Sequence, residues 1–244
     1  MASAGGGQVI FVLTGAGISR ESGIDTFRDK GGLWEQVRVE DVATPEGFAR
    51  DPARVYEFYD KRRRELQSGA IRPNPAHAAL ARLARSREVF LVTQNVDDLH
   101  ERGGSPAVMH MHGELLSALC SKCGARSRWT GDLGAKDACP ACGAAGGLRP
   151  DVVWFGETPY FMEEIARAAE RCDLFVSIGT SGAVYPAAGL VKIARANGAG
   201  TLEINLEPSQ NAAFFDGGLY GPASAKVPEW ADRVLRESGA SGDQ

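Results

Sequence analysis

VIFVLTGAGIS, residues 9–19, is an apolar run that ends in a glycine turn, and it decides the fold. Five consecutive apolar residues indicate a strand buried on both faces, because a half-exposed strand would alternate apolar and polar residues. Gly15 and Gly17 permit a tight turn in which backbone N–H groups approach a phosphate closely. The stretch therefore predicts a buried parallel strand followed by a phosphate-binding turn.

Three further apolar runs show the same pattern of a buried strand with a polar exit. They cover residues 89–93, 173–178 and 201–206. Helical segments at 76–86 and 160–171 precede two of them, an alternation typical of an α/β fold with a doubly wound parallel sheet. Because ligands bind at the carboxyl ends of such strands, we expect one shared crevice there.

The glycine turn differs from that of ordinary nicotinamide dehydrogenases. Arg20 stands where their fingerprint has its third glycine, and no acidic residue closes a second strand about 20 residues later. An ordinary dehydrogenase is therefore disfavoured, while phosphate binding and a plain strand-to-helix turn both stay open.

Composition argues against two classes of partner. The chain has 244 residues, with 27 Lys and Arg against 31 Asp and Glu, a formal net charge of −4. An acidic surface repels polyanions, so we expect no direct nucleic-acid partner. No basic segment precedes the run at 9–13 and no stretch reaches the roughly 20 apolar residues of a membrane helix, which predicts a cytoplasmic protein without a membrane partner.

Four of the five cysteines form two Cys-x-x-Cys pairs, Cys120 with Cys123 and Cys139 with Cys142. This spacing is typical of a zinc ribbon. Four thiolates complete a tetrahedral site and leave no position for water, so we expect one structural Zn²⁺ per chain, with a redox dithiol as the alternative. Cys172 is interpreted as an inert buried thiol.

Two insertions interrupt the α/β pattern. Residues 31–74 are interpreted as a helical insertion and residues 116–147 as the zinc-ribbon module, and together they are expected to form a small composite domain. Residues 1–30, 75–115 and 148–244 are expected to form the large nucleotide-binding domain.

Short motifs follow one another along nearly the whole chain. They are Gly15-Ala16-Gly17-Ile18-Ser19, Ser22-Gly23-Ile24, Phe27-Arg28, Gly32-Leu33-Trp34, Gln94-Asn95-Val96-Asp97, His112-Gly113, the cysteine pairs, Val152-Val153-Trp154-Phe155-Gly156-Glu157, Gly179-Thr180-Ser181 and Asn205-Leu206-Glu207. Together they resemble the sirtuin family of NAD-dependent protein lysine deacylases, and in particular its bacterial desuccinylase and deacetylase members. The resemblance implies a Rossmann-like large domain, a zinc-bearing small domain, and a cleft between them for NAD and an acylated lysine.

The resemblance also implies which residues bind NAD as a cosubstrate. They are Gly15, Ala16, Gly17, Ser19, Thr26, Phe27, Arg28, Trp34, Gln94, Asn95, Val96, Asp97, Gly179, Thr180, Ser181, Asn205, Leu206, Glu207 and Ala223. Asp25-Thr26 departs from the Pro-Asp of many sirtuins and is similar to some bacterial members. Helix capping is the alternative role for Asn95 and Asp97.

His112 stands where the family has its general base, and Asn95 is implied as a second catalytic residue. Imidazole suits proton transfer because its ordinary pKa of about 6.5 lies near working pH. His110 shares the same strand face by the period of two and is the competing candidate. His77 and His100 are interpreted as structural.

Two groups of residues are expected to bind the substrate. An acylated peptide is expected to add as a strand to Val153, Trp154, Phe155 and Gly156, with interdomain packing as the alternative. Tyr59 and Arg62, spaced i, i+3, are expected to bind an acyl carboxylate, which resembles the sirtuins that remove succinyl and malonyl groups. The alternative is that residues 62–64 are a solvated charge run.

These observations predict an NAD-dependent deacylase that removes succinyl, malonyl and acetyl groups from protein lysines, giving nicotinamide and O-acyl-ADP-ribose. One alternative is an NAD-sensing zinc-ribbon interaction module without turnover, which predicts a basic face around Lys122, Arg126, Arg128 and Lys136. The other is a protein mono-ADP-ribosyltransferase. The identity of the acylated protein partners and the oligomeric state stay open.

Overall fold

The computed structural model describes residues 8–24 and 37–237, and its centre is a six-stranded parallel sheet. The strand order is β3-β2-β1-β7-β8-β9, and each neighbouring pair is parallel. The strands are β1 (Val9–Thr14), β2 (Glu88–Thr93), β3 (Met109–His110), β7 (Leu174–Ile178), β8 (Gly200–Asn205) and β9 (Gly217–Tyr220). The doubly wound parallel sheet predicted from the apolar runs is therefore confirmed.

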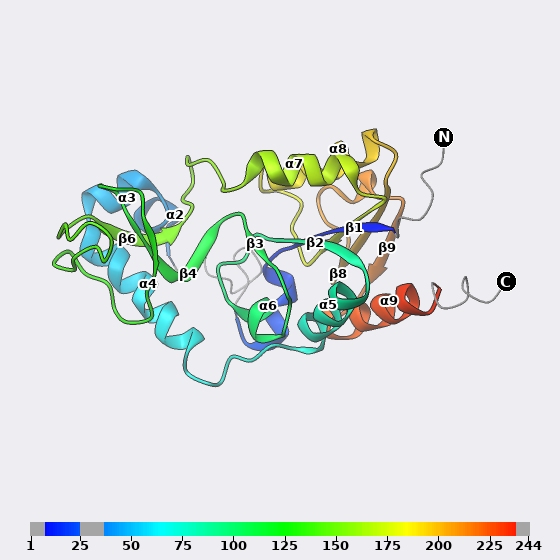
Figure 1. The fold of residues 1–244 in the computed structure, drawn as a ribbon, viewed down its shortest axis with the longest axis horizontal. Coiled ribbons are helices and arrows are strands. Elements are labelled where there is room, and N and C mark those ends of the chain that lie inside the picture. The colour runs from blue at the N-terminus through cyan, green and yellow to red at the C-terminus, as the bar shows by residue number, and fades with distance from the viewer. Residues whose placement is uncertain (1–7, 25–36, 238–244) are drawn as a thin grey trace.

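Helices cover both faces of this sheet (Figure 1). On one face Ile10 packs with Leu80 and Trp230, and on the other Phe11 packs with Ile165 and Val191. Neighbouring residues of β1 are thus buried on opposite faces, which is why its apolar run is continuous. The covering helices are α5 (Pro75–Ser86) and α9 (Ala223–Glu237) on the first face, and α7 (Met162–Arg171) and α8 (Leu190–Ala196) on the second.

The direction of chain order reverses between β1 and β7. From β1 the chain extends the sheet first through β2 and β3, and later through β7, β8 and β9. Such a reversal opens a crevice at the carboxyl ends of the two central strands. Short helices follow the strands along the chain: η1 (Ala16–Ile18) and η2 (Arg20–Ser22) after β1, α6 (Leu99–Arg102) after β2, η3 (Ala187–Gly189) after β7 and η4 (Ala212–Phe214) after β8.

A smaller body lies to one side of the main sheet (Figure 1). Its three strands are antiparallel in the order β5-β4-β6 and pack against α4, with Val55, Leu115 and Trp154 in a shared core. The elements are α2 (Val39–Val42), α3 (Pro45–Arg50), α4 (Pro52–Leu66), β4 (Gly113–Cys120), β5 (Arg126–Arg128) and β6 (Leu148–Val152). The small sheet thus extends beyond residues 116–147 at both ends.

Helix α4 carries the residues expected to bind the acyl group, and its start is well defined. Pro52 occupies the first helical position, and the Asp51 carboxylate accepts a hydrogen bond from the backbone N–H of Arg54 at 3.1 Å. Both features are typical of a helix N-terminus. The helix is therefore fixed in register, and Tyr59 and Arg62 lie in its middle.

Candidate functional site

A cavity of about 1320 Å³ lies at the carboxyl ends of β1, β2, β7 and β8 and reaches α4. All the expected cofactor and substrate residues in the described part of the chain line it, together with His112: Gly15, Ala16, Gly17, Ser19, Tyr59, Arg62, Gln94, Asn95, Val96, Asp97, Val153, Trp154, Phe155, Gly156, Gly179, Thr180, Ser181, Asn205, Leu206, Glu207 and Ala223. Thr26, Phe27, Arg28 and Trp34 lie outside the described residues. The shared crevice expected from the strand exits is present.

The glycines of the turn after β1 are required by close backbone packing. A Cβ atom on Gly15 would lie 2.8 Å from the carbonyl oxygen of Gly179, and one on Gly17 would lie 2.7 Å from the Gly179 Cα. The Gly17 N–H donates to the same Gly179 carbonyl at 2.9 Å. Gly179 itself has a φ of +63°, which favours glycine. The two loops that form the floor of the cavity are therefore held against each other.

Three polar side chains form a buried chain on this floor. Asn95 Nδ2 donates to Ser19 Oγ at 3.2 Å, and Ser19 Oγ donates to Asp97 Oδ2 at 3.0 Å. Burial raises the pKa of Asp97 to about 6, although hydrogen bonds from Leu99 N–H and Ser19 oppose the shift. The chain fixes the direction of each group, so these side chains are preorganised to meet a polar ligand.

His112 is held as a neutral imidazole at the edge of the cavity. Its Nδ1 lies 3.1 Å from the carbonyl oxygen of Gln94, and because a carbonyl only accepts, Nδ1 carries the proton. Nε2 is then the basic nitrogen. Burial lowers the pKa of His112, which keeps the ring neutral near pH 7. The side chain therefore has the tautomer and protonation state that a general base needs.

Both ring nitrogens of the competing histidine, His110, have hydrogen-bond partners within the fold. Nδ1 lies 3.0 Å from the Asn95 carbonyl oxygen and Nε2 lies 2.8 Å from Glu101 Oε1. Burial lowers the pKa of His110, but the Glu101 carboxylate outweighs it and raises the pKa overall. His110 does not line the cavity, which leaves His112 as the only one of the two that does.

His77 and His100 are both fully buried away from the cavity. His77 Nδ1 accepts from the backbone N–H of Asn74 and completes the cap of α5, while His100 Nε2 lies 2.9 Å from Thr14 Oγ1. The two rings are 5.0 Å apart, and burial lowers the pKa of His77 to about 4. These contacts are structural, as the sequence predicts.

Tyr59 and Arg62, one turn apart on α4, both line the cavity. The Tyr59 hydroxyl accepts a hydrogen bond from Trp154 Nε1 at 3.0 Å, and burial raises its pKa well above the usual value. Arg62 donates to the Phe58 carbonyl at 3.1 Å, and its guanidinium lies 3.6 Å from the centre of the Phe58 ring. A protonated phenol and a guanidinium on one wall form a site suited to a carboxylate.

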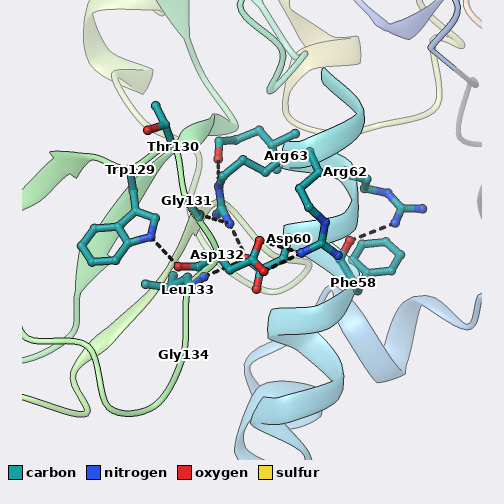
Figure 2. A network of polar contacts seen from close by, with 12 residues as sticks. Phe58, Asp60, Arg62, Arg63, Trp129, Thr130, Gly131, Asp132, Leu133 and Gly134 are labelled. Atoms are coloured by element: carbon teal, nitrogen blue, oxygen red, sulfur yellow. Dashed lines mark hydrogen bonds and ion pairs between the residues drawn. The ribbon is translucent and has the colours of Figure 1, made fainter. Parts of the chain in front are cut away.

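The neighbouring residues of α4 hold the helix against a loop of the small domain (Figure 2). Arg63 pairs with Asp60 and donates to the carbonyl oxygens of Leu115 at 3.0 Å and Gly131 at 3.2 Å. Asp60 also accepts from the N–H of Leu133 at 3.0 Å. We call this set, Asp60 and Arg63 with the backbone of residues 131–133, the α4 clamp.

The α4 clamp is not evident from the sequence, in which residues 62–64 form one run of arginines. Arg63 is 1% exposed, whereas Arg64 is exposed and pairs with Asp132 at 2.6 Å. Asp60, three residues before Arg63, could have indicated this pair, since residues of opposite charge at i and i+3 lie on one helix face.

The run expected to accept a peptide continues β6, which ends at Val152. The N–H groups of Val153 and Phe155 donate to the carbonyls of His112 and Ala43, both at 2.9 Å, and Trp154 N–H donates to the Glu157 carboxylate at 2.8 Å. Gly156 has a φ of +94°, so the chain turns there. The N–H groups of residues 153–155 are therefore all used within the fold, and the Trp154 carbonyl accepts the Glu157 N–H at 3.0 Å.

The four paired cysteines converge on one point of the small domain. Their Sγ atoms all lie within 4.8 Å of one another, with 3.8 Å between Cys123 and Cys139 and 3.9 Å between Cys120 and Cys142. Zn–S bonds of about 2.3 Å in a tetrahedron place sulfurs about 3.8 Å apart. The thiols fit the predicted zinc site. Cys172 is buried elsewhere, and burial raises the pKa of its thiol to about 11.

The interaction-module alternative requires a basic face, but two of its four cations make ion pairs or hydrogen bonds within the chain. Arg126 pairs with the fully buried Asp151 at 2.6 Å and with Glu114 at 3.2 Å, and Lys122 donates to the Ala145 carbonyl at 2.8 Å. Two of the four cations are thus committed within the fold.

Residues 15–186 of the chain match the Sir2 family. The chain belongs to this family. It is 57% identical over 231 residues to an NAD-dependent protein deacylase of Caulobacter vibrioides, covering 93% of this chain and 96% of that one. It is 55% identical over 236 residues to an NAD-dependent protein deacylase of Leishmania major, covering 95% and 97%. A solved complex of a mutant Sir2 homologue with ADP-ribose matches with a TM-score of 0.88 and 37% identity, covering 96% of this chain and 94% of that one.

For this Sir2 protein the expected enzyme class, NAD-dependent protein deacylase, is confirmed, as are the Rossmann-like fold and NAD as cosubstrate. The module without turnover and the mono-ADP-ribosyltransferase are not favoured. No helix among the described residues is long and apolar enough to cross a membrane. The roles of single residues, the domain boundaries and the cytoplasmic location stay predictions.

Proposed function

We propose that this protein removes succinyl and malonyl groups from protein lysines in preference to acetyl groups, and that it produces nicotinamide and an O-acyl-ADP-ribose. The observation that carries the proposal is the placement of Tyr59 and Arg62 on the wall of the cavity that His112 also lines. A phenol and a guanidinium recognise a carboxylate, which succinyl and malonyl groups have and an acetyl group lacks.

The arrangement supports separate roles for NAD and for the residues that line the cavity. NAD, when bound, supplies the sugar that takes up the acyl group and the nicotinamide that leaves. Gly15, Gly17 and Gly179 keep the two loops closely packed at the cavity, since their own N–H groups donate to carbonyl oxygens within the fold. We propose that the Asn95, Ser19 and Asp97 chain faces the polar part of NAD. His112 Nε2 accepts a proton, and the Gln94 carbonyl stabilises the imidazolium that results by holding its Nδ1–H.

The substrate residues complete the proposed site. We propose that the peptide backbone lies along the run 153–156, which lines the cavity, and that acylated proteins are bound with little preference for flanking sequence. The four cysteines hold zinc in a structural role, since the tetrahedral set leaves no open position.

We propose the domain division at 31–74 and 116–147, with the small sheet including Gly113 to Val152.

The test is mass spectrometry of one lysine peptide in acetyl and succinyl forms, with and without NAD. We expect NAD-dependent loss of both groups, with succinyl lost faster. Arg62→Met should reduce desuccinylation at least tenfold while deacetylation changes little, because a charged hydrogen bond contributes about 1.5–3 kcal/mol. Equal loss of both activities would refute the carboxylate site. His112→Ala should abolish both reactions without changing the circular dichroism spectrum.

A further inference from the structure

Trp154 belongs to the segment expected to bind the peptide, and its side chain contacts Tyr59, one of the two residues expected to bind the acyl carboxylate. It follows β6, is 3% exposed, and packs in the small-domain core, where its ring centre lies 5.2 Å from that of Phe48. Its buried indole N–H has a polar acceptor, because Nε1 donates a hydrogen bond to the Tyr59 hydroxyl at 3.0 Å.

This hydrogen bond determines what Tyr59 can offer a ligand. A phenol has one hydrogen to donate and one oxygen to accept with. The indole is a donor only, so it takes the accepting side of the Tyr59 oxygen. Within residues 8–24 and 37–237 the Tyr59 hydrogen has no acceptor of its own. Tyr59 is thereby set to donate, which favours a carboxylate over a methyl group.

The orientation of the indole is itself fixed by a closed set of contacts. The Arg149 guanidinium lies 4.1 Å from the centre of the Trp154 ring and pairs with Glu157 at 2.7 Å. Glu157 in turn accepts the backbone N–H of Trp154 at 2.8 Å. Because Glu157 offsets the charge of Arg149, this set holds the ring without adding net charge beside Tyr59.

We propose that Trp154 is a positioning residue for acyl selectivity: its indole N–H directs the Tyr59 hydroxyl as a donor toward acyl groups that end in a carboxylate. The inference rests on the carboxylate site proposed above. It adds a residue that touches neither the acyl carboxylate nor the reacting atoms but decides which side of the phenol faces them.

The test is Trp154→Phe, which keeps an aromatic ring and removes the N–H. Steady-state kinetics are measured with the succinyl and acetyl forms of one peptide at saturating NAD. We expect kcat/KM for the succinyl peptide to fall about fivefold, mainly through KM, which corresponds to one neutral hydrogen bond. Deacetylation should fall clearly less than desuccinylation, and circular dichroism with urea unfolding checks that the variant is folded. Equal loss on both peptides would reduce Trp154 to a packing residue and overturn the inference.

A double-mutant cycle shows whether Trp154 acts through Tyr59. The double variant Trp154→Phe, Tyr59→Phe should desuccinylate no more slowly than Tyr59→Phe alone, because the directed hydroxyl is already gone. Losses that multiply would overturn the inference. Trp129→Phe is the matched control, since Trp129 Nε1 donates to the Asp132 carbonyl at 3.1 Å and not to Tyr59. An equal fall in selectivity in that variant would also overturn it.

Failure of the inference and failure of the proposed function are distinguishable. If Tyr59→Phe and Arg62→Met lower the succinyl-to-acetyl ratio and Trp154→Phe does not, only the role of Trp154 is wrong. If Tyr59→Phe and Arg62→Met both leave the ratio unchanged, the carboxylate site is wrong, and the role of Trp154 is refuted with it.

Discussion

Replacing Arg63 by methionine tests the energetic weight of the α4 clamp. The side chain is 1% exposed, pairs with Asp60, and donates to two backbone carbonyl oxygens, those of Leu115 and Gly131. Methionine fills similar space but offers no donor. Asp60, which is also buried, would keep its contact with the Leu133 N–H and lose its counter-charge.

The expected loss of stability comes from the Asp60 charge, which stays buried after its partner is removed. Removing one partner of a buried ion pair costs about 3–5 kcal/mol, because the remaining charge is buried without compensation. Asp60→Asn together with Arg63→Met removes that charge as well, so the double variant should recover at least half of the loss. Arg64→Met is the matched control. Arg64 and Asp132 are both exposed, and a surface pair contributes about 0–1 kcal/mol.

The assay is urea unfolding of the zinc-loaded protein, followed by tryptophan fluorescence and by circular dichroism. Trp129 belongs to the loop that α4 contacts, so fluorescence reports on this region. With a urea slope of about 2–3 kcal/mol per molar, Arg63→Met should lower the midpoint by 1–2 M or so, and Arg64→Met by less than about 0.5 M. Equal shifts for the two variants, or a double variant less stable than Arg63→Met, would refute the reasoning.

Three further predictions concern the charge states and the metal. Asp97 has a pKa of about 6 in the fold against about 3.9 when unfolded, so the folded protein holds this proton more tightly and the free energy of unfolding falls as pH rises from 4 to 6. Above pH 6 the buried carboxylate costs about 3 kcal/mol. Asp97→Asn should therefore gain stability relative to the wild type as pH rises from 4 to 6, with a constant difference above that range, while losing NAD affinity. A difference in the free energy of urea unfolding that does not change between pH 4 and 6 would contradict this. Because burial lowers the pKa of His112, kcat/KM for deacylation should decline only below pH 6.5, and an acid limb centred above that value would exclude His112 as the base. Removing zinc with a chelator should unfold residues 116–147, detected as lost hydrogen-exchange protection there with the main sheet intact, since a closed thiolate site contributes folding free energy directly.

The sequence predicted the large domain well because its strands are buried on both faces. The runs at 9–13, 89–93, 173–178 and 201–206 correspond to β1, β2, β7 and β8 with ends shifted by one residue at most. Their order in the sheet could not be derived from periodicity, since pairing of β1 with β7 joins segments 160 residues apart. The bounds of the two insertions, taken from the breaks in this pattern and from the cysteines, stay predictions.

The choice between His110 and His112 shows where sequence reasoning stops. The period of two assigns both to one strand face, but β3 ends at His110, and the chain bends before β4 begins at Gly113. The two rings differ in their hydrogen-bond partners. Glu101 on α6 binds the Nε2 atom of His110, whereas the Gln94 carbonyl at the end of β2 orients His112 through its Nδ1 atom. Neither partner is adjacent in sequence, so the distinction required the fold.

The run Tyr59-Asp60-Lys61-Arg62-Arg63 combines two functions in one turn and a half of α4. Successive residues of a helix point about 100° apart, so two i, i+3 pairs offset by one residue occupy two neighbouring faces. Tyr59 and Arg62 face the cavity, whereas Asp60 and Arg63 face the loop of residues 131–133. The offset lets Asp60 and Arg63 fix the helix while Tyr59 and Arg62 stay on the cavity wall. The helix that carries the proposed acyl-binding residues is therefore held by contacts with the zinc-bearing module, although the four cysteines do not line the cavity.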